Sequence, residues 1–505
     1  MSPAIEELWR ALGEHGAQPA VQAGGRTLTY AQLRDAVRQR MELLATLGAR
    51  RVALALDNGL DWALWDLALL FSGRVCVPLP DFFSAAQQRH VLDSSGIDTL
   101  ISAGPMPDRP AAPAERGAIA ELAGACGFAD GGDGIWQRRP ASVPAVPTGT
   151  LKITYTSGTT GQPKGVCLDG EAQLAVARSL WQASSGCGVE RHLCVLPLAT
   201  LLENIAGIYA PLLAGACIEL RPMAEIGLQG ASGLDLMRFV GAIGASRPHS
   251  LILLPQLLLA LVAAAERGLP LPDSLRFIAV GGGRVAPQLL QRADALGLPV
   301  FEGYGLSECA SVVCLNTPSA RRIGTVGRPL AHAQVRIARN GEVQVRGARM
   351  LGYLGEPPLQ RGWLHTGDLG HFEDGFLVLH GRIKNQFITA FGRNVNPEWV
   401  EAELMQQSPV AQAWLHGEAL ARNVAVLAPR SPECSDAELD AVVAAVNARL
   451  PDYARAHHWL RADAPFSAAN GLATPNGRLR RDALFEHYRA AIDARLATQH
   501  DEIRA

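Results

Sequence analysis

Hydroxyl groups, glycines and one lysine are concentrated in a single short stretch of the chain, Tyr155–Val166. The stretch follows the β-rich segment Leu151–Tyr155, so a strand runs directly into a glycine-rich turn. Glycines let backbone N–H groups approach phosphate oxygens, hydroxyls donate further hydrogen bonds, and a lysine supplies a positive charge. The pattern therefore predicts a polyphosphate-binding loop. Its predicted members are Thr156, Ser157, Gly158, Thr159, Thr160, Gly161 and Lys164.

This loop differs from the common nucleoside-triphosphate loop, which has four residues between its glycines and then Gly-Lys-Ser/Thr. Here Gly158 and Gly161 are separated by two residues, and Lys164 lies between Pro163 and Gly165. The simplest alternative is a solvated Ser/Thr/Gly turn that binds nothing. The ordered succession of twelve positions favours the phosphate-binding interpretation.

The same stretch closely resembles the signature of the adenylate-forming superfamily, which includes acyl-CoA synthetases, firefly luciferases and peptide-synthetase adenylation domains. Further segments match the family's motifs in the family's order, from about residue 151 almost to the end of the chain. The pattern is most similar to fatty acyl-CoA synthetases and fatty acyl-AMP ligases. The matching segments are Gly303–Glu308, Thr366–Asp368, Gly381–Lys384, Gly392–Pro397 and Thr474–Arg478.

The resemblance implies which groups would lie against the adenine of ATP. Gly281, Gly282 and Gly283 follow the predicted strand Phe277–Val280, and in the family this turn lies near the adenine and the acyl group. Tyr304 would stack on the adenine ring. For the three glycines, the alternative is an ordinary tight turn.

Four polar side chains are implied to bind the metal, the phosphates and the ribose. Ser307 would bond a phosphate, and Glu308 would hold Mg²⁺ through a hard carboxylate oxygen. Asp368 would accept hydrogen bonds from the ribose hydroxyls, and Arg382 would assist at the ribose or a phosphate. A surface ion pair is the alternative for Glu308, Asp368 and Arg382.

The resemblance also implies two domains joined by a hinge at Lys384. Residues 1–383 would form an N-terminal adenylate-forming domain with the ATP and acyl sites, and residues 384–505 a small mobile domain. Rotation about the hinge would bring the thiol-side loop of Gly392, Arg393 and Asn394 to the site. Many CoA ligases have Gly-Glu-Asn in this loop, and the Gly-Arg-Asn found here is similar to fatty acyl-AMP ligases that serve carrier proteins.

The implied reaction has two halves. A carboxylate attacks the α-phosphate of ATP to give an acyl-adenylate and pyrophosphate, and a thiol then attacks the activated carbonyl and releases AMP. The first half brings two anions together and needs stabilisation of charge on the transferring phosphate. Lys164, Glu308 and Arg478 are the implied catalytic groups. The family has a lysine where this chain has Arg478, and an arginine keeps the charge but is longer and planar.

The segment from Leu198 to Asn204 indicates the class of acid. Long-chain acyl-CoA synthetases carry a similar Leu-Pro-Leu-Ala segment followed by His and then Glu. In this chain Thr200 occupies the His position and Glu203 the acidic one, and Gly170 replaces a His that commonly follows the phosphate loop. The Asp with which amino-acid-activating domains hold an ammonium group is absent from this segment. We therefore expect a fatty or other apolar carboxylic acid, and a role in fatty acid metabolism.

Two classes of function remain open at this point. The first is an acid–thiol ligase that uses ATP and Mg²⁺ with CoA as acceptor, or with the phosphopantetheine of an acyl carrier protein. The second is a catalytically weak nucleotide-binding relative that acts as a sensor or partner subunit. The presence of Glu308 and Asp368 beside a Thr-rich loop favours the enzyme, because a scaffold has no need of a metal-binding carboxylate.

Composition limits the other possibilities. A chain of 505 residues is too long to fold around one compact core, so at least two domains are expected. A content of 48% hydrophobic and 19% charged residues is typical of globular proteins. A net charge of −2 gives no sign of a nucleic-acid partner. Nine cysteines without a CxxC pair favour free thiols in a reducing compartment. The start lacks a signal-peptide pattern, and the apolar run Leu251–Ala265 is shorter than the roughly 20 residues of a membrane span. We expect a cytoplasmic protein without a transmembrane segment.

Alternating helix and strand patterns must position these side chains. They predict an α/β fold, with a large N-terminal domain of parallel-rich sheets flanked by helices, a small β region, and a small mobile α+β C-terminal domain. Residues 102–150, rich in Pro and Gly, are expected to be connecting loops. The main predicted elements are a helix capped by Thr29, a helical run Trp62–Phe71, strands Val75–Pro78 and Leu193–Pro197, a helix capped by Ser435, and a terminal helix Asp482–Ala505.

Overall fold

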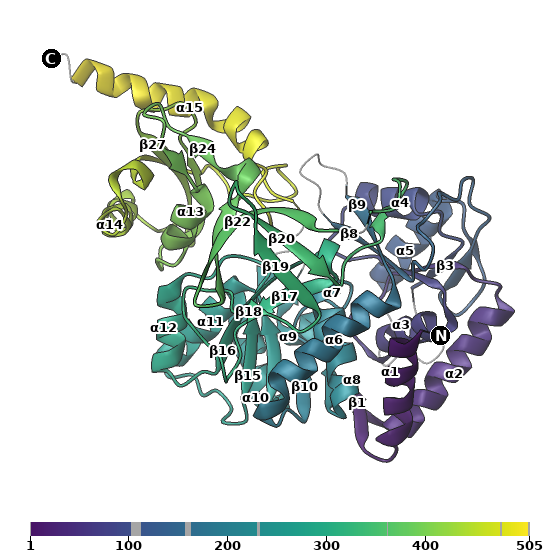
Figure 1. Ribbon diagram of the computed structural model, residues 1–505. Coiled ribbons are helices and arrows are strands. Elements are labelled where there is room, and N and C mark those ends of the chain that lie inside the picture. The colour runs from purple at the N-terminus through teal and green to yellow at the C-terminus, as the bar shows by residue number, and fades with distance from the viewer. Residues whose placement is uncertain are drawn as a thin grey trace. The chain divides into compact units, whose positions relative to one another are not determined.

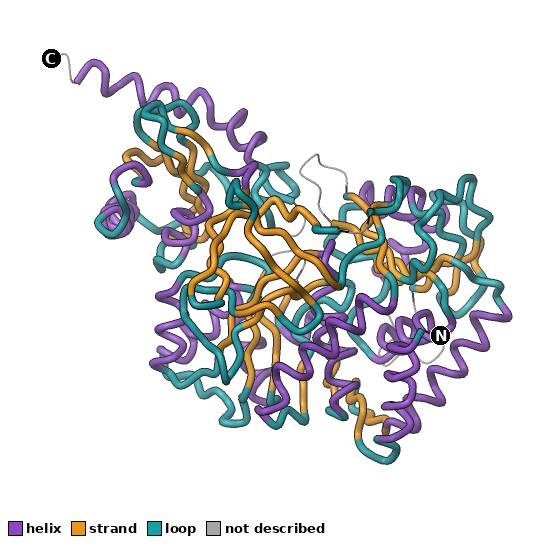
Figure 2. The backbone as a smooth tube through the Cα atoms, viewed as in Figure 1, coloured by secondary structure: helices purple, strands orange, loops and turns teal. Residues whose placement is uncertain are grey.

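The computed structural model describes residues 2–102, 113–156, 163–229, 233–360, 362–474 and 477–502 (Figures 1 and 2). The chain divides into two compact units, each assembled from segments that are distant in the sequence. The first unit comprises Met1–Gly282, Arg292–Val335 and Val345–Leu364. The second comprises Gly283–Gln291, Arg336–Gln344 and His365–Ala505.

The first unit contains a nine-stranded sheet whose centre is parallel. Its six central strands pair in parallel, and its three remaining strands add in antiparallel fashion at the two edges. In spatial order the strands are β18 (Arg328–Pro329), β17 (Ser311–Leu315), β16 (Val300–Leu306), β15 (Phe277–Val280), β14 (Ser250–Leu253), β10 (Arg191–Leu193), β11 (Cys217–Leu220), β1 (Pro19–Ala23) and β2 (Arg26–Thr29).

An eight-stranded sheet in the same unit carries the strands on either side of the predicted phosphate loop. Its four central strands are parallel, and the outer strands are antiparallel to their neighbours. The order is β21 (Gly352–Tyr353), β9 (Lys164–Leu168), β8 (Lys152–Thr156), β4 (Val75–Pro78), β3 (Arg51–Leu54), β5 (Thr99–Ile101), β7 (Ile135–Gln137) and β6 (Ala129–Asp130). A separate two-stranded ribbon consists of β12 (Leu228–Gln229) and β13 (Gly233–Leu234).

Helix α3 (Leu60–Ser72) contacts strands of both large sheets, namely β3 and β4 of one and β1 of the other. Every residue from Trp62 to Phe71 is buried, as expected for a helix that is apolar on all sides. The other helices from the N-terminus to residue 295 are α1 (Pro3–Glu14), α2 (Tyr30–Thr46), α4 (Ala85–Ser94), α5 (Pro113–Ala125), α6 (Gly170–Ser184), α7 (Leu201–Glu203), α8 (Ala210–Ala214), α9 (Met223–Ile226), α10 (Leu236–Ser246), α11 (Pro255–Glu266) and α12 (Pro287–Ala295). The short non-α helices are η1 (Ser185–Cys187), η2 (Asn204–Tyr209) and η3 (Ser307–Cys309).

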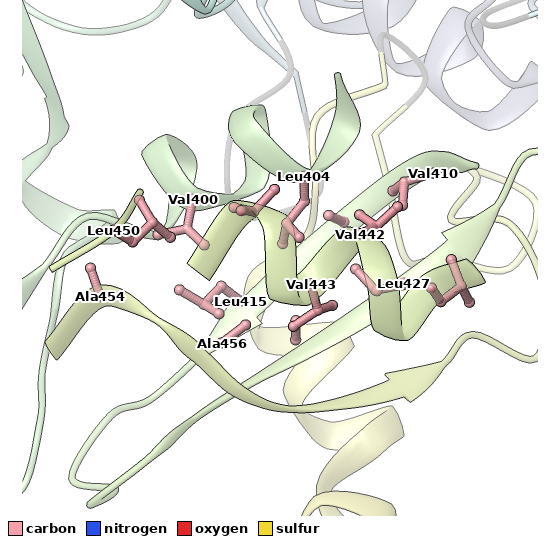
Figure 3. Packing of buried hydrophobic residues seen from close by; sticks show 14 of the residues in the cluster. Val400, Leu404, Val410, Leu415, Leu427, Val442, Val443, Leu450, Ala454 and Ala456 are labelled. Carbon is pink, nitrogen blue, oxygen red and sulfur yellow. The ribbon is translucent and has the colours of Figure 1, made fainter. Parts of the chain in front are cut away.

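The second unit is built around a three-stranded sheet with an apolar layer on each face. Side chains of a strand alternate between the two faces, so Leu415 belongs to one layer and Trp414 to the other. Helices α13 (Pro397–Met405) and α14 (Asp436–Asn447) contribute Val400, Leu404 and Val443 to the first layer, which Figure 3 shows from close by. Helix α15 (Arg481–Glu502) supplies the second layer. The strands are β26 (Val410–His416), β27 (Asn423–Pro429) and β28 (Ala456–Arg461).

Shorter elements complete the C-terminal part of the chain. A four-stranded sheet has the order β19 (Ala333–Ile337), β20 (Glu342–Gly347), β22 (Leu364–Glu373) and β23 (Phe376–Arg382). It is followed by η4 (Ile383–Asn385), the ribbon of β24 (Phe387–Ile388) and β25 (Asn394–Val395), and later η5 (Asp452–Ala454). The predicted α/β class is confirmed by the parallel centres of the two large sheets.

Several local predictions are confirmed, and two are wrong. Thr29 and Ser435 cap α2 and α14, and each forms a capping box with the residue three positions on. The predicted strand Leu193–Pro197 is wrong, because β10 ends at Leu193 and a hydrogen-bonded turn follows it. Within 102–150, the prediction of loops alone is wrong. Helix α5 and strands β6 and β7 lie there. Strand β7 forms despite the surrounding Gly and Pro residues because it pairs with β5, and its apolar Ile135 is buried.

Among the described residues, every helix is too short or too polar to cross a lipid bilayer. The apolar run Leu251–Ala265 covers most of β14 and most of α11. Within it, α11 begins at Pro255, and Leu257, Leu258 and Leu261 are buried. The run is therefore part of the protein core.

Candidate active site

The predicted phosphate loop connects two paired strands, β8 and β9 (Figure 1). Thr156 at the end of β8 lies opposite Lys164 at the start of β9, so the hairpin fixes both ends of the loop. The predicted loop residues Ser157, Gly158, Thr159, Thr160 and Gly161 lie outside the described residues. Helix α4 also contacts the residues on either side of the loop. Ser94 Oγ is 2.6 Å from Tyr155 Oη, and His90 Nε2 is 3.2 Å from the Pro163 carbonyl oxygen.

The structure brings Lys164 and Glu308 to the same aromatic side chain, that of Tyr353. The Lys164 ammonium lies 5.3 Å from the centre of the Tyr353 ring, and the Tyr353 hydroxyl donates a 2.9 Å hydrogen bond to Glu308 Oε1. Lys164 Nζ also lies 3.4 Å from Glu356 Oε1. Two predicted site residues that are 144 positions apart in the chain are thereby collected at one place in the first unit.

The adenine-side candidates lie near or just after the carboxyl ends of two adjacent parallel strands. Gly281, Gly282 and Gly283 follow β15, and Tyr304 lies near the end of β16, which pairs in parallel with β15. Gly282 has a φ of +78°. Ligands of open α/β sheets commonly bind beyond the carboxyl ends of the strands. Tyr304, Ser307 and Glu308 are all partly buried.

A glycine at position 305 is required by the close approach of the next strand. β16 turns back through η3 and pairs with β17 in antiparallel fashion, with a register irregularity between Tyr304 and Gly305. A Cβ atom at Gly305 would lie 1.8 Å from the Ser311 carbonyl oxygen, well inside contact distance. Any larger residue would therefore push apart the hairpin that carries Ser307 and Glu308.

In the second unit, Asp368 and Arg382 face each other across the β22–β23 hairpin. Arg382 Nε lies 2.8 Å from Asp368 Oδ1, and the Asp368 side chain is 8% exposed. The ion pair that was the alternative for these residues is therefore present. A carboxylate oriented by an arginine still has lone pairs for further donors, so the pair is compatible with the predicted ribose contact, which stays a prediction.

The remaining predicted residues of the second unit are exposed. Lys384 lies in η4. Gly392 and Arg393 lie in the loop between β24 and β25, and Asn394 is the first residue of β25. This loop is closed by hydrogen bonds from Thr389 N to the Arg393 carbonyl and from Gly392 N to the Thr389 carbonyl, of 3.0 and 2.8 Å. Thr474 N donates a hydrogen bond to the Arg478 carbonyl over 2.7 Å.

The predicted acyl-site residues point into the protein instead of forming an evident ligand group. Thr200 Oγ1 donates to the Pro197 carbonyl over 2.7 Å. Glu203 is completely buried and accepts from Leu196 N at 3.2 Å, with His192 Nε2 at 3.3 Å. Cys194 lies beside them, and burial, followed by the Glu203 carboxylate, raises the pKa of its thiol. Among the described residues, His192, Cys194 and Glu203 lie close enough together to hold a metal ion. Glu203, however, already has a hydrogen-bonding partner on each carboxylate oxygen.

Sequence reasoning missed a buried ion pair between β8 and α3. Lys152 Nζ in β8 lies 2.8 Å from Asp66 Oδ1 in α3, with side chains 2% and 1% exposed. Tyr209 of the π-helical turn η2 donates to Asp66 Oδ2 over 2.6 Å, and Asn204 Nδ2 donates to the same oxygen over 2.9 Å. Burial and then the Asp66 charge raise the pKa of Tyr209. Two features of the sequence could have indicated this pair. Lys152 stands among apolar residues of a strand, and Asp66 stands among apolar residues of a helix.

Comparison with known proteins gives a match over most of the chain. A family model described as AMP-binding enzyme matches residues 8–354. The 3-[(3aS,4S,7aS)-7a-methyl-1,5-dioxo-octahydro-1H-inden-4-yl]propanoyl:CoA ligase of Mycobacterium tuberculosis is 31% identical over 82% of this chain and 85% of that protein. A long-chain-fatty-acid–CoA ligase of Mycobacterium bovis is 26% identical over 92% of each.

Solved structures show the same fold. O-succinylbenzoate coenzyme A synthetase from Bacillus subtilis, in complex with ATP and a magnesium ion, matches with a TM-score of 0.72. The match covers 94% of this chain and 98% of that chain at 23% identity. The likeness therefore extends over both large sheets and over the C-terminal elements.

Proposed function

From the fact that this chain belongs to the AMP-binding enzyme family, we propose that it is an ATP-dependent acid–thiol ligase. It activates a small carboxylic acid as an acyl-adenylate and transfers the acyl group to the thiol of CoA. The observation that carries the proposal is the convergence of Lys164 and Glu308 on Tyr353, beside the hairpin that bears the glycine-rich loop. A cation and a metal-binding carboxylate at one polyphosphate site are what adenylate formation requires.

In the first half-reaction, the loop and Lys164 bind the phosphates, and Ser307 adds a hydrogen bond. Glu308 fits a divalent cation, because its carboxylate is a hard oxygen ligand that is already oriented through one oxygen by Tyr353. A bound Mg²⁺ would neutralise charge on the phosphates. Asp368, held by Arg382 at 2.8 Å, accepts the ribose hydroxyls. Tyr304 stacks on the adenine.

The second half-reaction depends on the exposed groups of the second unit. Movement about Lys384 exchanges Arg478 for the loop of Gly392, Arg393 and Asn394, and the thiol then attacks the activated carbonyl. Atoms balance in each half: pyrophosphate leaves when the acyl–phosphate bond forms, and AMP leaves when the thioester forms. The hinge and the exchange are parts of the proposal.

We propose an apolar acid as the substrate. The acidic residue of α7 is Glu203, which is completely buried and has a hydrogen-bonding partner on each carboxylate oxygen, so it is not placed to hold a substrate ammonium. Relatives named for an alicyclic propanoyl group and for long-chain fatty acids support an acid of this class. A fatty acid is one member of it.

The experiment that tests the proposal is ATP–pyrophosphate exchange with a panel of fatty, alicyclic and aromatic acids. We expect exchange with at least one apolar acid, and AMP release on adding CoA. Holo acyl carrier protein in place of CoA tests the alternative acceptor. ATP binding without exchange for any acid would contradict the ligase and favour a catalytically weak nucleotide-binding protein.

Replacing Arg478 tests its assignment to the first half-reaction. We expect Arg478→Lys to raise the adenylation rate by about tenfold, because a compact ammonium can occupy the point between carboxylate and phosphate that a planar guanidinium does not. Thioester formation from preformed adenylate should be almost unchanged. The two rates are measured separately by pyrophosphate exchange and by single-turnover transfer.

Arg480 provides the matched control, because it is also exposed and donates to the Gly471 carbonyl over 3.0 Å. Arg480→Lys should alter neither half-reaction. Equal effects of Arg478→Lys on both halves would mean that Arg478 is not a group of the first half.

A further inference from the structure

Tyr353 occupies a position that neither the motifs nor the proposed reaction assigns. It lies in β21, the edge strand that pairs with β9, and its register partner is Val166, two residues after Lys164. Two backbone hydrogen bonds of 2.8 Å, from Leu351 N to the Cys167 carbonyl and from Leu354 N to the Gly165 carbonyl, flank this pairing. The backbone of Tyr353 is therefore fixed relative to the strand that follows the phosphate loop.

The two ends of the Tyr353 side chain meet two different site residues. The ring lies under the Lys164 ammonium at 5.3 Å, a distance at which a cation is attracted to an aromatic face. The hydroxyl donates to Glu308 Oε1 at 2.9 Å, in a partly buried setting. The backbone supports the same contact, because Met350 N donates to the Glu308 carbonyl over 2.7 Å.

Among the described residues, Lys164 also pairs with Glu356 at the protein surface. The side chains of Lys164 and its partner Glu356 are 55% and 51% exposed, and such surface pairs contribute little to geometry. Glu356 belongs to the same turn, because its N–H donates to the Tyr353 carbonyl over 3.1 Å. Within the described part of the chain, Tyr353 thus contacts both Lys164 and Glu308, whereas Glu356 connects Lys164 to the turn.

We propose that Tyr353 is a positioning residue of the nucleotide site, whose hydroxyl orients the Glu308 carboxylate toward the metal ion and whose ring holds the Lys164 ammonium toward the polyphosphate. The inference rests on the proposed function, which gives Glu308 and Lys164 those roles. A hydrogen bond to one oxygen of a metal-binding carboxylate sets which oxygen faces the metal. The two contacts involve different atoms of one side chain, so their effects can be separated.

The test is calorimetric titration of the full chain with ATP, across a series of Mg²⁺ concentrations and in excess EDTA. Tyr353→Phe keeps the ring and removes the hydroxyl. We expect the Mg²⁺ concentration for half-maximal ATP binding to rise about tenfold, because this is the effect of losing one hydrogen bond to a charged group. Affinity for ATP in EDTA should stay within about twofold. Tyr353→Leu should show the same Mg²⁺ shift and an additional loss of about threefold in EDTA.

Tyr453→Phe is the matched control, because Tyr453 is 43% exposed and lies in η5 of the second unit; it should titrate as the wild type. A merely structural role of Tyr353 would lower ATP affinity equally with and without Mg²⁺, and that result overturns the inference. Wild-type Mg²⁺ dependence in Tyr353→Phe overturns it as well. The titration uses no acid, so its outcome is separate from the exchange assay, whose failure would reject the ligase instead.

Discussion

Glu308→Ala is expected to abolish Mg²⁺-dependent adenylation, lowering the rate of ATP–pyrophosphate exchange by at least about 10²–10³-fold. Glu308 lies in η3 at the turn from β16 into β17, and its carboxylate is oriented by the Tyr353 hydroxyl at 2.9 Å. Alanine removes the hard oxygen ligand proposed for the metal, so charge on the transferring phosphate is no longer neutralised. The measurement is the exchange rate with a productive acid across a Mg²⁺ titration.

Glu308→Gln separates charge from shape in the same assay. The amide can still accept from the Tyr353 hydroxyl but has lost the negative charge, so we expect a loss of similar size. Glu266→Ala is the control, since Glu266 is a surface residue paired with Arg292 at 2.7 Å, and it should exchange as the wild type. An unchanged Mg²⁺ profile in Glu308→Ala would remove Glu308 from the metal site.

Lys152→Met is expected to lower the free energy of unfolding by about 3–5 kcal/mol, because it leaves the Asp66 carboxylate buried without its ammonium partner. Asp66 is 1% exposed and lies in the helix that contacts both large sheets. The hydrogen bonds from Asn204 and Tyr209 remain, but neither carries a positive charge. Urea unfolding followed by circular dichroism measures the change.

A second substitution shows whether the loss comes from the unpaired charge. In Lys152→Met/Asp66→Asn the buried charge is gone, so stability should recover by more than about 1 kcal/mol relative to the single variant. Arg38→Met is the control for removing a cation, since Arg38 and Asp35 form an exposed pair at 3.2 Å, and it should cost less than about 1 kcal/mol. An equally small loss in Lys152→Met would mean that water or a structural shift compensates Asp66.

Local sequence patterns were sufficient where neighbouring residues decide the structure. The caps at Thr29 and Ser435 form through atoms three residues apart, so hydroxyl and amide or carboxylate spacing predicts them without tertiary information. The strand Phe277–Val280 was predicted from its own apolar run and has those bounds. Patterns failed where long-range pairing decides, as at Ile135 in β7, which becomes a strand because β5 is available beside it.

The sequence alone determined the family resemblance and the α/β class. It also identified the candidate site residues, because each motif consists of residues that are close together in the chain. These candidates include Lys164, Glu308, Asp368 and Arg478. Only the tertiary structure decided which of them meet. It placed Tyr353 between Lys164 and Glu308 through a two-residue edge strand that has no sequence signature of its own. It also paired Lys152 with Asp66 across 86 positions. The physical reason is that strand register and the burial of charge depend on partners distant in the chain, which a one-dimensional pattern does not specify.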